Sequence, residues 1–137
     1  MFNATFSRIA GSRALVLDAR RRDAREGPLQ YVKVAEILKT SVVPVFVVPG
    51  DNEWNDLTNP GEGWEYWTKH YTEFEKTFTN APRVERQKVR PDNFAWRSTG
   101  VLLIGINLVG GRVHDKAEWA TRMRQDADWI HDNMEKH

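Results

Sequence analysis

Apolar positions along the chain alternate between short, mostly apolar runs and longer stretches with a helical period. Such short runs predict buried strands and lie at residues 14–17, 42–48 and 101–109. The last run follows the turn Ser98-Thr99-Gly100, which predicts a β-hairpin whose second strand is buried on both faces. Apolar residues at every third or fourth position predict amphipathic helices and lie in residues 29–38, 64–78 and 119–134. A strand, a helix and a strand thus follow one another up to residue 48, and a parallel right-handed crossover is their default connection. The pattern predicts one α/β domain over residues 1–137.

A polar cluster follows the run at residues 42–48, in which six of seven residues are Val or Phe. Pro49 and Gly50 stop this strand, and the next polar residues are Asp51, Asn52, Glu53, Asn55 and Asp56. Ligands of open α/β sheets bind beyond the carboxyl ends of strands, and clustered oxygen atoms suit divalent cations. Gly50 would let the backbone approach a ligand closely. Pro-Gly-Asp-Asn is also ordinary turn chemistry, in which Asp51 or Asn52 caps the next segment, and this alternative stays open.

The strand and the residues Pro-Gly-Asp-Asn-Glu-Trp resemble the strand-to-loop signature of calcineurin-like metallophosphoesterases, in the branch where the usual Gly-Asn-His-Asp/Glu reads Gly-Asp-Asn-Glu. The resemblance implies a partial α/β/β/α sandwich and hydrolysis of a phosphoester with divalent manganese, iron or zinc. By position it implies Asp51 as a metal ligand and Asn52 in the place of the catalytic histidine, with Glu53 orienting the loop. An amide donates a hydrogen bond to a phosphoryl oxygen but cannot act as a general acid. Asn52 is therefore expected to contact phosphate.

Two further site residues are implied by the same resemblance. The preceding strand of the family ends in a metal-bridging aspartate, and Asp18 stands at that place, although Leu17 replaces the usual glycine before it. The alternative for Asp18 is a turn cap. Residues 93–111 also resemble this branch, in which a polar residue at a strand end lies near the site, and Asn107 is the candidate. The alternative is that Asn107 ties down the loop containing Gly110 and Gly111.

Several ligands of the family have no counterpart in this chain. The family supplies Asp-x-His at its first strand, a later lone histidine and Gly-His-x-His, and none of these patterns occurs here. The resemblance covers residues 29–136, so we expect a truncated domain, substoichiometric metal and hydrolysis that is weak or lost. The alternative is a non-catalytic binding or assembly module that uses an aromatic-rich surface around Trp54, Trp64 and Trp67 or an exposed sheet edge. An exposed edge or face at residues 101–109 would also favour self-association.

Composition narrows the partners further. The net charge of +1 makes no strong case for nucleic acid or an anionic membrane. The basic residues within 20–26 are interpreted as a solvated loop, because no aromatic residue is interleaved to stack a base. The chain has no cysteine, so any metal would need oxygen or imidazole ligands. No signal peptide or membrane-spanning segment is recognised, which predicts a soluble chain of unknown compartment.

Two later stretches of the chain also have a helical pattern of apolar residues. Aromatic residues form one helical face, which is expected to pack on the sheet because each ring left in water forfeits on the order of 2 kcal/mol. These residues are Trp64, Trp67, Tyr71, Phe74 and Phe78. In the last helix, capped by Asp115, the apolar positions are Trp119, Met123, Ala127, Ile130 and Met134. The outer face is expected to carry Arg122, Arg124, Asp126, Asp128 and Asp132.

Overall fold

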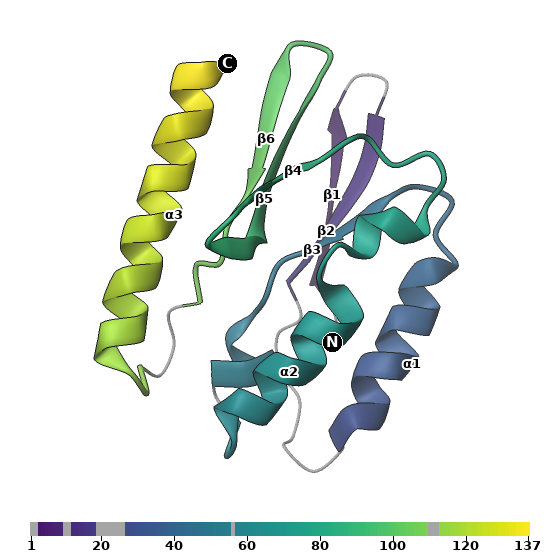
Figure 1. Cartoon of the computed structure of the whole chain (residues 1–137). Coiled ribbons are helices and arrows are strands. Elements are labelled where there is room, and N and C mark those ends of the chain that lie inside the picture. Colours follow the sequence, from purple (N-terminus) through teal and green to yellow (C-terminus); the bar gives the residue numbers. More distant parts are fainter. Residues whose placement is uncertain (1–2, 10–11, 19–26, 56, 110–112) are drawn as a thin grey trace.

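The computed structural model describes residues 3–9, 12–18, 27–55, 57–109 and 113–137. Side chains are described from Leu29 onward, apart from those of Asn52 and Glu53 and of the residues between these ranges. The basic cluster at residues 20–26 and the glycines of the 110–111 loop lie outside the described residues. The chain is mixed α/β, as predicted, with its strands in two sheets (Figure 1).

The first sheet, sheet A, contains the predicted strand-helix-strand unit. Strand β1 (Asn3–Ile9) pairs antiparallel with β2 (Ser12–Asp18), which pairs in parallel with β3 (Val45–Val47). Helix α1 (Gly27–Lys39) connects β2 to β3. Strand β3 is shorter than the predicted run at residues 42–48. Pro44 has no N–H for a ladder bond, and Val43 instead exchanges hydrogen bonds with the Ser41 hydroxyl.

The second sheet, sheet B, is antiparallel and contains β4 (Glu85–Gln87), β5 (Arg90–Ser98) and β6 (Val101–Gly105) in that order. The predicted hairpin is confirmed: β5 and β6 join through Thr99 (φ 48°) and Gly100 (φ +81°). The prediction that residues 101–109 form a strand buried on both faces is wrong. Strand β6 ends at Gly105 and its residues are exposed or half-buried. It is an edge strand of sheet B, whereas β5 lies between β4 and β6.

The aromatic face packs on sheet A, as predicted. Helix α2 (Pro60–Tyr71) begins earlier than the aromatic pattern, because Asn59 caps it and Pro60 occupies its first turn. It ends before Thr72, whose backbone is extended, and the single 3-10 turn η2 (Phe74–Thr77) follows. The core formed by these elements consists of Ala35, Leu38, Val45, Val47, Trp67, Tyr71 and Phe74.

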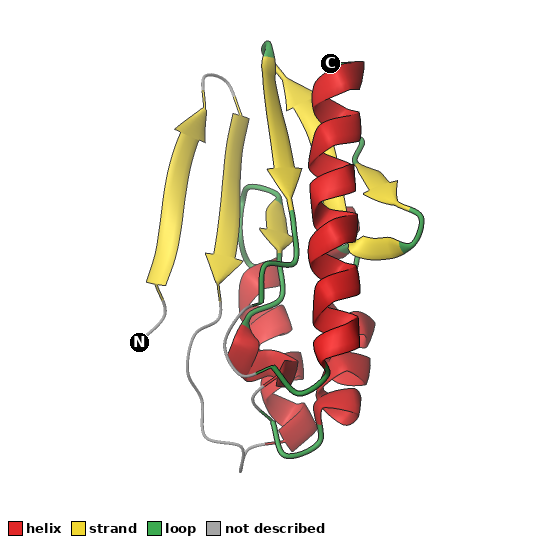
Figure 2. Ribbon diagram, turned by 90° about the vertical axis from the view of Figure 1, so that its left-hand side faces the viewer, coloured by secondary structure: helices red, strands yellow, loops and turns green. Residues whose placement is uncertain are grey.

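The opposite face of β3 packs on sheet B. The ring of Phe46 stacks on that of Trp96, with centroids 4.1 Å apart, and lies 5.7 Å from that of Phe94. These three side chains form a second buried core between the sheets. The layers are therefore α1 and α2, sheet A, sheet B and α3 (Lys116–Lys136), with α3 on the opposite side of the molecule from α1 and α2 (Figures 1 and 2).

Helix α3 turns a polar face toward sheet B. Asp115 caps it, as predicted, by accepting hydrogen bonds from the amides of Ala117 and Glu118. The outer-face prediction is wrong for Arg122 and Asp126, which are 1% and 2% exposed. They are buried because β5 and the segment after β6 offer polar partners to them rather than apolar ones. Among the described helices, none is long and apolar enough to cross a membrane.

Candidate functional site

The acidic residues that the sequence predicts as ligands lie at the edge of sheet A where β2 and β3 end. Because these strands are parallel, with Leu17 opposite Val47, Asp18 and the segment after Val47 leave the sheet at the same edge. Asp18 is the last residue of β2, and Asp51 follows β3 after three residues. We refer to Asp18 together with residues 48–55 as the carboxyl edge of sheet A. The backbone therefore brings two of the predicted metal ligands to one edge.

The acidic loop itself is a short π-helical turn, η1 (Asp51–Asn55). Gly50 is buried immediately before it, while the Asp51 side chain is half-buried. Asn52 and Glu53 lie within the turn, but their side chains are outside the described part. The cap of the following helix α2 is Asn59, whose Oδ1 accepts a hydrogen bond from the amide of Glu62 at 3.3 Å. Asp51 and Asn52 are therefore not the cap of that helix.

Trp54 anchors the turn to the body of the molecule. Its ring centroid lies 5.0 Å from that of Trp64, which stacks on the buried Trp67 at 5.2 Å and an interplanar angle of 6°. On the other side, the Arg122 guanidinium carbon lies 5.4 Å from the Trp54 centroid, within the range of a cation–π contact. The three tryptophans thus pack on one another, and they hold the acidic loop between α2 and α3.

Arg122 also fixes the segment that follows β6. Its Nη1 donates to the carbonyl oxygens of Val109 at 2.7 Å and Asn107 at 3.1 Å, and its Nε donates to Glu118 Oε1 at 3.1 Å. A guanidinium suits this position because its donors are fixed in one plane and point in different directions. Sequence reasoning missed this residue. The available signal was the spacing of Glu118, Arg122 and Asp126, which lie one turn apart on one helical face.

Asn107 is fully buried at the end of the same segment. Its Nδ2 donates to Asp92 Oδ2 at 2.7 Å, its Oδ1 accepts from the Val109 amide at 3.4 Å, and its own amide donates to Asn93 Oδ1 at 2.9 Å. These bonds tie down residues 107–109, so they support the loop-anchoring interpretation of Asn107. Its connection to the acidic loop runs through Arg122, which contacts both Asn107 and Trp54.

Two buried carboxyl groups complete this polar layer. Asp126 Oδ1 accepts a hydrogen bond from Asn93 Nδ2 at 2.7 Å, while its Oδ2 is buried without a hydrogen-bond partner. Burial raises the pKa of Asp126, and the bond from Asn93 opposes that shift. Burial likewise raises the pKa of Asp92, against the opposing hydrogen bond from Asn107. Both groups face the interior, so we assign them to the framework behind the site.

A histidine that the sequence did not single out also reaches the acidic loop. The Nε2 atom of His114 contacts the carbonyl oxygen of Asn55 at the end of the turn, across a separation of 59 residues. His70, which is nearer in sequence, lies on α2 with its pKa lowered by burial and by Lys69 and Lys39. Proximity in sequence was therefore a poor guide to the histidine that meets the loop.

The described donors do not form a closed metal site. Among residues with described side chains, no group of three His, Cys, Asp or Glu could hold one ion. Asp51 is described at the carboxyl edge, whereas the side chains of Asp18, Asn52 and Glu53 are not. The donor set that the chain can direct to this edge is thus a small number of oxygen atoms. Oxygen ligands of this kind suit divalent cations held with several waters.

Comparison with known proteins gives no assignment: no family model, no curated protein and no solved structure matches the chain. The resemblance to metallophosphoesterases consequently stays a prediction from residues 42–56 and 93–111. The function is argued below from the arrangement at the carboxyl edge.

Proposed function

We propose that this chain is a metallophosphoesterase-like domain that binds a divalent cation and a phosphoester at the carboxyl edge of sheet A, with weak hydrolysis. The observation that carries the proposal is the parallel pairing of β2 with β3, because it brings Asp18 at the end of β2 and Asp51 in the turn after β3 to one edge. Ligands of α/β proteins bind at such edges because strands hold the loops in place. The layer order of helices, sheet, sheet and helix also agrees with the architecture that the resemblance implies.

The residues at this edge have distinct proposed roles. Asp51 and Asp18 would hold the cation through carboxylate oxygens, and Asn52 would donate a hydrogen bond to a phosphoryl oxygen. Glu53 would orient the turn from within it. A bound divalent cation supplies Lewis-acid polarisation of a phosphoryl oxygen. Trp54, held between Trp64 and Arg122, fixes the position of the turn.

Weak turnover follows from the same donor set. Two-metal hydrolases hold both ions with ligands from several strand ends, so that the attacking and leaving oxygens are both stabilised. The described residues gather no such group. An amide at position 52 also supplies no proton to a leaving group. We therefore expect the chain to bind the cation weakly. We also expect it to hydrolyse a generic phosphomonoester at a rate slightly above the uncatalysed rate.

The test compares three purified proteins: the natural chain, Asp51→Ala and Asp132→Ala. Asp132 is a matched control, because its exposed carboxylate lies on the outer surface of α3. Manganese binding by calorimetry and manganese-dependent hydrolysis of p-nitrophenyl phosphate should both be lost in Asp51→Ala and kept in Asp132→Ala, with equal thermal stability. Equal manganese binding by the two variants would refute the assignment of Asp51. Stoichiometric binding of two ions with rapid turnover would refute the proposed weak site.

A further inference from the structure

An apolar stripe runs along α3 beside the face that sheet B buries. It consists of Trp119, Met123, Ala127, Ile130 and Met134, which follow one another at steps of four, four, three and four residues. Trp119 is 38% exposed and Met134 is 67% exposed, and Ala127 between them is exposed, whereas Met123 and Ile130 are half-buried. The buried face of the same helix is polar instead, with Arg122, Asp126 and Asn133. The stripe therefore leaves apolar side chains at both ends of α3 in contact with solvent, which favours an interaction surface.

We infer that this stripe is the interface of a homodimer in which α3 packs antiparallel against α3 of a second copy. Steps of three and four residues make one continuous face of a helix. When the helix is read in the opposite direction, the same positions coincide: Trp119 lies opposite Met134 of the second copy, and Met123 lies opposite its Ile130. Ala127 then lies beside the two-fold axis. A two-fold interface requires this self-complementarity, because each copy contributes the same surface.

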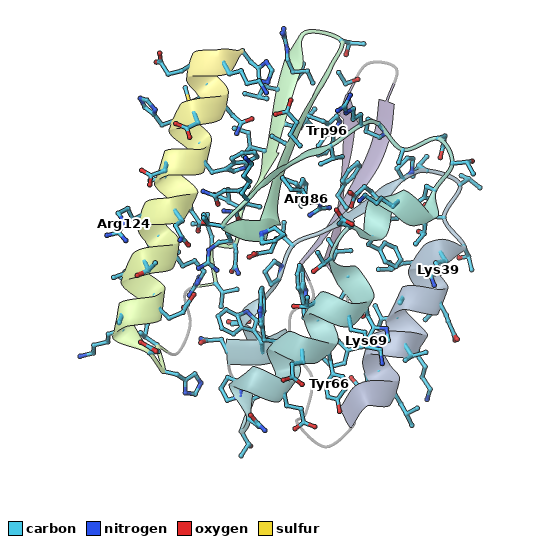
Figure 3. The ribbon with its side chains drawn as sticks, viewed as in Figure 1. Lys39, Tyr66, Lys69, Arg86, Trp96 and Arg124 are labelled. Atoms are coloured by element: carbon cyan, nitrogen blue, oxygen red, sulfur yellow. The ribbon has the colours of Figure 1, made fainter. Side chains whose placement is uncertain are left out.

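The charges along the stripe favour the same pairing. With Trp119 opposite Met134, Arg124 of one copy lies opposite position 129 of the other copy. Asp128 of that copy is therefore one residue away. Figure 3 shows Arg124 extending away from the sheets on the outer side of α3. Asp128 is exposed one turn further along. Two such pairs form in each dimer, whereas in a parallel arrangement the flank that carries Arg124 and Asp128 would lie on opposite sides of the helix pair in the two copies, and neither pair would form. Charge complementarity thus selects the antiparallel orientation.

The shape of the surface suits another helix. Helix α3 has 21 residues, so it extends for about 30 Å, and its small residue Ala127 lies at the centre of the stripe. A small residue at the crossing point lets two helices approach to about 8 Å. Larger side chains toward both ends of the stripe then pack across the interface. This surface differs from the strand at residues 101–109, which the sequence indicated as the site of self-association.

The first test is the mass in solution, measured by sedimentation equilibrium over a wide concentration range. We expect a species of twice the 15.9 kDa of one chain and a return to the single-chain mass in Met134→Lys. The matched control is Ile37→Lys on α1, because Ile37 is 66% exposed against 67% for Met134. A natural chain that stays at 15.9 kDa at every concentration would overturn the inference. So would equal dissociation by the two lysine variants.

The second test reports the register. The chain has no cysteine, so a single introduced thiol can form only an intermolecular disulfide. Ala127→Cys should cross-link on mild oxidation, because its two copies face each other at the axis, whereas Asp132→Cys on the opposite flank of α3 should not. Arg124→Asp should weaken the dimer, and adding Asp128→Arg should restore it. Cross-linking of both cysteine variants to equal extents, or no recovery in the double charge variant, would overturn the antiparallel pairing.

Discussion

Replacement of Arg122 by methionine tests how the acidic loop is held. The side chain is 1% exposed and donates two hydrogen bonds to the carbonyl oxygens of residues 107 and 109. Methionine keeps much of the apolar stem but leaves both carbonyls and the Glu118 carboxylate without this donor. Breaking a buried charged contact of this kind costs about 3 to 5 kcal/mol. Loss of the cation–π contact with Trp54 adds about 0.5 to 1 kcal/mol.

Relief of the desolvation of the guanidinium offsets part of this cost, so we expect Arg122→Met to lower the free energy of unfolding by about 3 kcal/mol. For a chain of this length, the melting temperature should fall by about 10 °C. The assay is urea denaturation followed by circular dichroism. Because the chain has six tryptophans, the native-state fluorescence is compared with that of Trp54→Phe, and the difference reports the surroundings of Trp54. Arg124→Met is the matched control, because Arg124 is exposed two residues further along α3. We expect that variant to change stability by less than about 0.5 kcal/mol.

Equal stability of Arg122→Met and Arg124→Met would refute the reasoning. It would mean that the buried guanidinium contributes no more than an exposed one, so that α3 does not hold residues 107–109 or the acidic loop. A large loss of stability with unchanged tryptophan fluorescence in the native state would separate the two contacts. In that case the carbonyl bonds would be essential and the Trp54 contact would not.

The remaining predictions concern packing and pH. Gly105→Ala should lower the free energy of unfolding by about 1 to 3 kcal/mol, because its added Cβ would lie 2.3 Å from Cζ of the tightly packed Phe94. The Cβ added by Gly61→Ala would lie 3.7 Å from its nearest neighbour. In the same urea titration that variant should raise the free energy of unfolding by up to about 1 kcal/mol. Equal effects of the two alanines would contradict the packing account. Burial raises the pKa of Asp126 above its usual 3.8, so the folded state holds more protons than the unfolded one and stability should fall as pH rises from 3.8 through the raised value. Asp126→Asn should make that slope shallower, and an unchanged slope would refute the assignment.

The local pattern of the sequence was enough to predict the strand-helix-strand unit and the hairpin. The run at residues 14–17, the helix after Pro28 and the run before Pro49 each have a local cause, namely apolar periodicity and proline punctuation. These elements appear as β2, α1 and β3, with parallel pairing. The sequence also placed the polar cluster directly after β3. The position of this polar cluster at a strand end could therefore be predicted from the local sequence alone.

The buried polar layer could not be predicted from local periodicity. Hydrophobic spacing assigns polar positions of α3 to solvent, yet Arg122 and Asp126 face sheet B, where Asn93 and Asn107 offer partners. The burial of Arg122 and Asp126 depends on contacts with residues that lie 15 and 33 positions away in the sequence. The contact of His114 with the acidic loop has the same origin, since it joins segments 59 residues apart. Hydrogen bonding across the fold outweighed helical amphipathicity at these positions.

Manganese titration of the isotopically labelled protein, followed by NMR, tests the central claim most directly. A bound paramagnetic ion broadens the amide signals nearest to it, so the signals of Asp18 and residues 48–55 should broaden first. The same titration of Asp51→Ala should leave them sharp. Selective broadening at the acidic residues of α3, or broadening of the carboxyl edge that persists without the Asp51 carboxylate, would contradict a cation site formed where β2 and β3 end.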